Sequence, residues 1–325
     1  KEKVELSASI CKTDLMSESV REFPELQGIM GGHLSHAQGF DKEIVDAIKE
    51  QYLPIGLDSA LPKKLFNITL SITDKIDTLV GFFGVNEIPS SSKDPFALRR
   101  TALGIIRIII ENKKDLKIND LISYSHKLYL DQKFNFKNKT LHNDIVIFLK
   151  DRFRHYLKEK NIRHDIIESS TNVFNLNKIS LLFEKSKSLN KVINNKIGND
   201  IVSTYKRAFN ILQTEVKDIN NDLQNTTDPG IFKNEFEKNL YKKVNELKKY
   251  FSGISNDENF DETLMLLSDA KKVIFDFFDN VKVNDDNNSV KKNRLELINS
   301  LCKTFENFTD FHLIKDINEQ TNSKL

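Results

Sequence analysis

The chain has 325 residues, 39% of them hydrophobic and 30% charged, which is an ordinary soluble balance with room for two or three domains. Six prolines and eleven glycines provide few turns, so the composition argues against a many-stranded β protein and favours helices throughout. The net charge of +2 excludes a uniformly basic nucleic-acid binder, and any contact with RNA has to come from a local patch.

Cysteine content and hydropathy predict the compartment. Cys11 and Cys302 lie far apart and provide neither a disulfide framework nor a metal quartet, so we expect a reduced cytoplasm. No apolar run approaches the ~18 residues of a membrane span, since "ALGIIRIIIE" is too short and contains Arg107. We therefore expect no membrane contact. The chain begins at Lys1, inside a predicted helix and without Met, so we expect it to be a piece of a longer protein.

In the first third of the chain, apolar spacing predicts helices separated by single turns. The expected helices cover residues 2–19, 23–36, 41–52, 64–84 and 94–112. The last has a clear start, with Asp94 placed to cap and Pro95 at the first helical position. The glycines of "GIMGGHL" are expected to form a close turn between helices, because neither a preceding strand nor the spacing of a phosphate loop is present.

Two helices are expected between residues 117 and 161, the second at 140–160, and a further one in the Asn-rich segment 175–196. The outer side of the 140–160 helix is basic and includes Arg152 and Arg154, which serve either a phosphate backbone or only solubility.

The last part of the chain predicts a helical bundle. Four amphipathic helices with short connections are expected at 200–216, 231–251, 260–281 and 289–308. After about residue 316 the apolar periodicity ends, and the tail is expected to be disordered.

The stretch "SITDKIDTLVGFFG" contains two carboxylates, Asp74 and Asp77, opposite the apolar stripe of a predicted helix. They either face solvent or, if further ligands converge on them, hold a divalent cation. His33 and His36 are one helical turn apart but have no third ligand nearby, so we expect surface histidines. No local nucleophile motif is present.

Several long stretches occur in the order of a known family. They include "SICKTDLMSESVREFPELQGIMGG", "ITDKIDTLVGFFGVNEIPSSSKDPFALRRTALGIIRIIIE", "TYKRAFNIL" and "FFDNVKVNDDNNSVKKNRLELI". They closely resemble the C-terminal part of the beta subunit of the bacterial two-subunit (alpha2 beta2) glycyl-tRNA synthetase. The resemblance implies an all-α fold with a degenerate HD-type helical domain at 1–115, a helical connector at 116–197, an α-helical anticodon-binding bundle at 198–316 and a disordered tail at 317–325.

The resemblance also bears on the two carboxylates. In the His-Asp metal-phosphohydrolase superfamily, a His-Asp pair and a later Asp hold the metal. Here Cys11 and Lys12 stand where the pair is needed, while Asp74 matches the later aspartate. Lys12 would place a positive charge where the cation should sit. The resemblance therefore implies no metal, no cofactor and no catalysis in this chain, with Asp74 a vestigial position.

The implied function is tRNA binding and scaffolding within a glycine–tRNA ligase. The implied partners are glycine tRNA, recognised at its anticodon region, and the alpha subunit, which is expected to hold ATP with magnesium and to perform the chemistry. DNA is not an expected partner. Two alternatives stay open: an active HD-type metal phosphohydrolase, against which the missing His-Asp pair argues, and a purely structural helical interaction module.

Some residues are candidates for contact with tRNA. Lys206 and Asn210 share one helix face with Arg207 beside them, and a cation with an amide suits one phosphate and one base edge. Arg294 instead lies within an apolar stripe, so it must snorkel, pair internally with a carboxylate such as Asp279, or reach a ligand, and we favour the internal pair. The candidate set is Lys206, Arg207, Asn210, Arg152, Arg154, Asn280 and Arg294.

Overall fold

The computed structural model describes residues 1–90, 92–114, 116–216, 223, 226–253 and 260–315. Every regular element in these ranges is a helix, which confirms the predicted all-α class. None of these helices combines the length and the apolar character that crossing a bilayer requires. The packing divides the chain into two units, Lys1–Tyr156 with Asn175–Ser180, and Leu157–Phe174 with Leu181–Leu325, and each is described by itself. The predicted tail at 317–325 lies outside the described residues.

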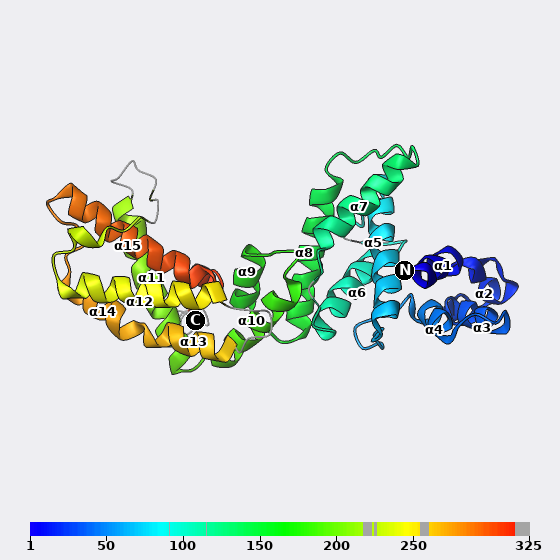
Figure 1. The fold of residues 1–325 in the computed structure, drawn as a ribbon, viewed down its shortest axis with the longest axis horizontal. Helices are drawn as coiled ribbons and strands as arrows, with labels where there is room; N and C mark the ends of the chain where they lie inside the picture. Colours follow the sequence, from blue (N-terminus) through cyan, green and yellow to red (C-terminus); the bar gives the residue numbers. More distant parts are fainter. Residues whose placement is uncertain (91, 115, 217–222, 224–225, 254–259, 316–325) are drawn as a thin grey trace. The chain divides into compact units, whose positions relative to one another are not determined.

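The first unit is organised around one long helix, α5. Its helices are α1 (Glu2–Ile10), α2 (Glu18–Glu22), α3 (Ile29–Ala37), α4 (Lys42–Glu50), α5 (Leu65–Gly84), α6 (Leu98–Glu111), α7 (Ile118–Asp131) and most of α8 (Leu141–Glu159). Helix α5 runs between the group of α1 to α4 and the pair of α6 and α7, and it packs against α1, α4, α6 and α7 (Figure 1).

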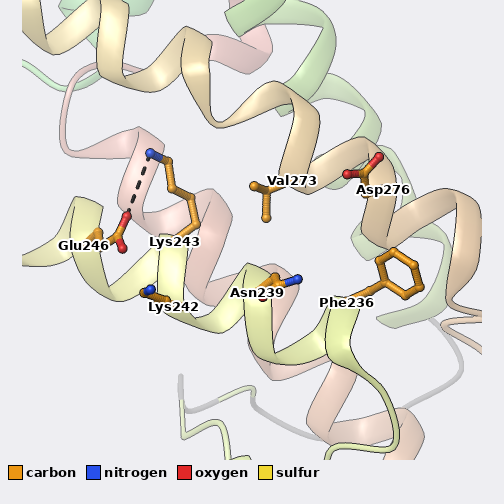
Figure 2. Close-up of a pocket in the computed structure, with 7 residues that line it drawn as sticks. All are labelled: Phe236, Asn239, Lys242, Lys243, Glu246, Val273 and Asp276. Carbon is orange, nitrogen blue, oxygen red and sulfur yellow. Dashed lines mark ion pairs between the residues drawn. The ribbon is translucent and has the colours of Figure 1, made fainter.

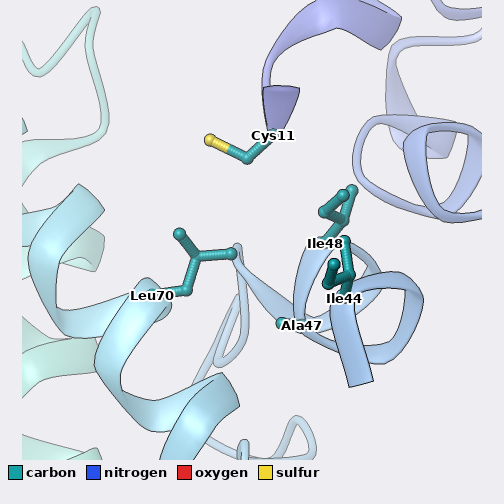
Figure 3. Packing of buried hydrophobic residues seen from close by; sticks show 5 residues of the cluster. All are labelled: Cys11, Ile44, Ala47, Ile48 and Leu70. Atoms are coloured by element: carbon teal, nitrogen blue, oxygen red, sulfur yellow. The ribbon is translucent and has the colours of Figure 1, made fainter. Parts of the chain in front are cut away.

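A small apolar cluster joins α1, α4 and α5. Figure 3 shows Cys11, at the end of α1, with Leu70 of α5 and three residues of α4. Cys11 is 6% exposed, and its thiol donates to the carbonyl of Ala8 at 3.3 Å. Burial raises the pKa of this thiol. Cys11 therefore serves as a small core residue.

The helix predicted at residues 2–19 is wrong, because the chain turns after Ile10. A 3₁₀ turn, Thr13–Met16, precedes α2 and places Asp14 in the interior. The Asp14 carboxylate accepts from the backbone N–H of Gly28 at 2.6 Å and of Gly31 at 3.1 Å, and so caps the start of α3. The helix predicted at 23–36 accordingly begins later, at Ile29.

The turn predicted at "GIMGGHL" is also wrong, since Gly31 and Gly32 lie inside α3. A Cβ on Gly31 would lie 2.9 Å from Cγ2 of Ile48, so the glycine allows α3 and α4 to pack closely. Of the three glycines in this stretch, only Gly28, with a φ of 78°, has a turn conformation that favours glycine.

Helix α6 starts four residues later than predicted. Ala97 adopts the left-handed conformation before it, and Pro95 lies outside the helix. The Asp94 carboxylate still caps, accepting from the N–H groups of Leu98 at 2.8 Å and Arg99 at 3.0 Å.

The second unit contains the predicted bundle. Its helices are α9 (His164–Asn172), most of α10 (Ile179–Val192), α11 (Lys196–Val216), α12 (Glu235–Gly253), α13 (Phe260–Asp269), α14 (Lys271–Asn280) and α15 (Asn288–Glu306). Helix α11 packs against α13, α14 and α15, while α12 packs against α14 and α15 (Figure 1). The single helix predicted at 260–281 is wrong, because it is interrupted at the buried Ala270. Helix α9 was not predicted.

Candidate functional site

Of the α11 residues predicted to contact RNA, Arg207 lies beside two aromatic residues of α14. A guanidinium nitrogen of Arg207 lies 2.6 Å from a carboxylate oxygen of Asp279. The Arg207 Cζ is 4.7 Å from the ring centroid of Phe275 and 5.3 Å from that of Phe278. The guanidinium is thus held against two rings by a carboxylate, and both rings are half-buried.

Lys206 and Asn210 complete this surface. They lie one turn apart on α11, and Lys206 is half-buried while Asn210 is exposed. We call Lys206, Arg207, Asn210, Phe275 and Phe278 the α11–α14 surface. Sequence reasoning missed the two phenylalanines, although they are spaced one turn apart in "IFDFFDN".

A groove adjoins this surface between the start of α11 and α14. It has a volume of about 600 Å³ and shares Phe275 with the surface. Lys271 lies on this groove, with its ammonium 2.7 Å from a carboxylate oxygen of Asp200 and 5.4 Å from the Phe275 ring centroid. Lys272 is exposed at the same groove. Three carboxylates line the same groove as three lysines, so the groove offers an aromatic wall but no net positive charge to a phosphate.

A second groove lies between α12 and α14. Figure 2 shows Lys242, Lys243 and Glu246 of α12 at one end and the Phe236 ring with Asp276 of α14 at the other. The Lys243 ammonium lies 3.9 Å from the Glu246 carboxylate. Two carboxylates offset two cations here, so this groove offers no net positive charge to a phosphate.

Arg294 lies in the interior of the second unit, where an internal pair was predicted. It is 4% exposed, and its guanidinium lies 2.5 Å from Glu237 and 2.9 Å from Asp285. It also donates to the Lys282 carbonyl at 2.8 Å. The internal pair is therefore confirmed, but the predicted partner Asp279 is wrong, because that carboxylate belongs to Arg207.

Glu237 is fixed by a second set of bonds. Its other carboxylate oxygen accepts from the N–H groups of Lys233 at 2.6 Å and Asn234 at 3.0 Å, while its own N–H donates to the Asn234 side chain at 3.1 Å. This reciprocal cap starts α12. Hydrogen bonding from the Asn287 N–H, followed by Lys233, lowers the pKa of the neighbouring Asp285 to about 2.

The remaining predicted residues are not gathered on one surface. Asn280 is exposed at the end of α14, and its amide donates to the Asp276 carbonyl at 2.8 Å. Arg152 and Arg154 belong to the first unit. Arg152 pairs with the adjacent Asp151, and Arg154 is exposed.

The two carboxylates of α5 have separate roles in the first unit. The Lys12 ammonium lies 2.5 Å from Asp74 and 5.0 Å from the Tyr52 ring centroid. Asp77 instead accepts from Ser125 at 3.0 Å and Tyr129 at 3.2 Å, and so connects α5 to α7. Burial, and then the charge of Asp77, raise the pKa of Tyr129 to about 12.

The residues at Asp74 do not fit a divalent cation. Its one carboxylate is already paired with an ammonium group, and Cys11 points into an apolar cluster. Across the part of the chain that the structure describes, no three His, Cys, Asp or Glu side chains converge to hold a metal. His33 and His36 are exposed, as predicted.

Two family models match long stretches of the chain. Residues 201–317, which make up most of the second unit, match the family model of the DALR anticodon binding domain. Residues 1–172 match the family model of the glycyl-tRNA synthetase beta subunit. The chain belongs to the family of glycyl-tRNA synthetase beta subunits.

Curated relatives agree with this family. The chain is 38% identical over 307 residues to the glycine–tRNA ligase beta subunit of Rickettsia canadensis, covering 94% of this chain and 44% of that protein. The Rickettsia africae subunit is 37% identical, with 94% and 44% covered, and one from Rickettsia bellii is 38% identical, with 94% and 43% covered. The chain thus spans less than half the length of these relatives.

Proposed function

We propose that this chain is the tRNA-binding and scaffolding portion of a glycyl-tRNA synthetase beta subunit, and that the α11–α14 surface contacts the anticodon region of glycine tRNA. The observation that carries this proposal is the Arg207 guanidinium held over Phe275 and Phe278, within the stretch that matches an anticodon-binding domain. Bases of RNA loops are splayed out and stack on aromatic rings and arginine planes.

The chemistry of the surface assigns each residue a part in recognition. The Phe275 and Phe278 rings with Arg207 provide a stacking platform. Lys206 directly precedes Arg207 on α11 and contributes a cation for a phosphate. The exposed Asn210 amide both donates and accepts, as reading a base edge requires.

The wider assembly is part of the same proposal. The alpha subunit is the second partner, and it carries glycine activation with ATP and magnesium in the cytoplasm. The name shared by the relatives, a ligase beta subunit, supports this division of labour. The absence of a glycine-rich phosphate loop from the sequence also supports it. The ion pair between Asp74 and Lys12 disfavours the phosphohydrolase alternative.

The test is a salt-dependent titration of the chain with glycine tRNA and with a variant altered in its anticodon. Lys206→Ala should weaken binding and reduce the salt slope by roughly one unit. Asn210→Ala should cost roughly 1–3 kcal/mol, and more for the cognate tRNA. Phe275→Leu should lose stacking worth roughly 1–3 kcal/mol for both tRNAs. Lys249→Ala, at an exposed position of α12, is the control and should change nothing.

Footprinting identifies the contacted nucleotides. Wild type should protect the anticodon loop, and a Lys206→Ala, Arg207→Ala, Asn210→Ala triple variant should not. Equal protection by both proteins would show that the surface is only a solvated helix face. A chain that binds no tRNA at all would support the structural-module alternative.

A further inference from the structure

A pocket of about 610 Å³ lies beside Asp74, and it is separate from the α11–α14 surface because its lining belongs to the first unit. Residues from five parts of this unit line it: the turn after α1, Gln27 before α3, the segment after α4, helix α5 and the start of α6 with the two residues before it. The lining residues that bear on its chemistry are Lys12, Tyr52, Asp74, Lys75, Phe96 and Arg100.

The charge of this pocket is positive. Three cations, Lys12, Lys75 and Arg100, face one carboxylate, Asp74, which is already paired with Lys12. Arg100 is exposed on the first turn of α6, and no described carboxylate pairs with it. The pocket therefore has an unbalanced charge that an anion would neutralise.

Lys75 forms the floor of the pocket. It is 5% exposed, and its ammonium donates to the Gln51 carbonyl at 3.1 Å and to the Ser71 hydroxyl at 2.9 Å. These two acceptors are neutral, and an ammonium group has three protons to donate. Burial lowers the pKa of Lys75 to about 8, since no acceptor that it reaches carries a charge.

Aromatic rings form the walls. Phe82 of α5 and Phe96 stack with ring centroids 4.2 Å apart and an interplanar angle of 27°. Phe96 is 43% exposed, so it keeps an accessible surface at the pocket. Tyr52 supports the Lys12 ammonium from another side. A flat ring entering the pocket thus meets an aromatic surface next to cations.

We propose that this pocket binds a mononucleotide, with its phosphate between Lys12 and Arg100 and its base against Phe96. The Lys12 ammonium is paired with Asp74, so it attracts the phosphate through its charge and without a direct hydrogen bond. Asp74 is committed to that ion pair and is not free to act as a base, so the pocket holds the nucleotide without cleaving it. The nucleotide is either free in solution or the phosphorylated end of an RNA strand, because both present the same chemistry.

The test is calorimetric titration of the chain with four probes: AMP, GMP, adenosine and inorganic phosphate. A nucleotide should bind about tenfold or more tightly than adenosine or phosphate alone, because it reaches both the cations and the ring.

Two variants separate the two parts of the pocket. Arg100→Gln should weaken AMP binding about tenfold and leave adenosine unchanged, because it removes a charge-assisted contact to phosphate. Phe96→Leu should weaken AMP and adenosine but leave inorganic phosphate unchanged. Both positions are exposed, and melting curves check that the variants fold. Arg21→Gln, an exposed arginine of α2 outside the pocket, is the matched control and should bind like wild type.

Three results would overturn the proposal: no heat with AMP or GMP at millimolar concentration, equal affinity for AMP and adenosine, or AMP binding that neither variant changes. A 5′-phosphorylated oligoribonucleotide then identifies the source. If it displaces AMP, the ligand is an RNA end, and if it does not, the ligand is a free nucleotide. Because the variants lie in the first unit, failure here leaves the anticodon-region proposal intact.

Discussion

Replacing Arg294 by Met tests the most buried charge network of the second unit. In the native protein the guanidinium pairs with Glu237, which is 1% exposed, and with Asp285. Arg294→Met keeps a long apolar side chain in the stripe but leaves the Glu237 carboxylate buried without a cation. Removing one partner of a buried ion pair costs about 3–5 kcal/mol of unfolding free energy.

Scanning calorimetry measures this loss. A unit of this size shifts by roughly 2–4 °C per kcal/mol, so the transition of the second unit should fall by about 10 °C. Adding Glu237→Gln should recover a substantial part of the loss, because it removes the buried charge and keeps an oxygen to accept from the start of α12. Lys292→Met, at the exposed position two residues before Arg294, is the control and should stay within about 0.5 kcal/mol.

Affinity for glycine tRNA completes the test. If Arg294 has only an internal role, Arg294→Met should hardly change this affinity at temperatures below its melting transition. A variant that melts like wild type but no longer binds tRNA would refute the assignment. So would a double variant that is less stable than Arg294→Met alone.

Five further outcomes are expected, four from particular contacts and one from the proposed role of the alpha subunit. Asp14→Ala should destabilise the first unit by about 1–3 kcal/mol in urea, because two backbone N–H groups lose a buried acceptor. Burial lowers the pKa of Lys75 from 10.5 to about 8, so between these two pH values the unfolded state binds a proton that the folded state does not. As pH rises from about 8 to 10.5, the unfolding free energy of wild type should therefore increase by about 3 kcal/mol relative to that of Lys75→Met. The pKa of Asp285 is lowered to about 2, so its contribution should be complete above about pH 4 and lost as pH falls towards 2, and Asp285→Asn should flatten that part of the curve. Elemental analysis should find no stoichiometric transition metal at Asp74, and glycine-dependent pyrophosphate exchange should require an added alpha chain.

The helices that could be predicted from the sequence are those with a long local pattern. Helix α5 was expected at 64–84 and spans Leu65–Gly84, because its apolar stripe repeats over five turns. The errors come from contacts between distant residues. Asp14 turns inward to cap α3, and Gly31 accommodates Ile48, so neither the break after α1 nor the continuous α3 has a local signal.

The candidate site was predicted only in part, because the sequence shows spacing within one helix but not contacts between helices. The shared face of Lys206 and Asn210 follows from helical spacing on one element. The rings beside Arg207 and its partner Asp279 belong to another helix, and helix packing decides which carboxylate an arginine meets. The apolar stripe predicted that Arg294 pairs internally, but it contained no information that selects Glu237 over Asp279.

The ammonium of Lys12 at Asp74 also limits how this sequence can change. Lys12→Asp alone would replace the ion pair at Asp74 by two carboxylates that face each other, and Cys11→His alone would force a larger polar ring into the packed cluster of Figure 3. Each single step towards a His-Asp metal site passes through a less stable protein, although the two together would supply further ligands. Single substitutions at Cys11 or Lys12 therefore do not lead to a metal centre without first destabilising the protein.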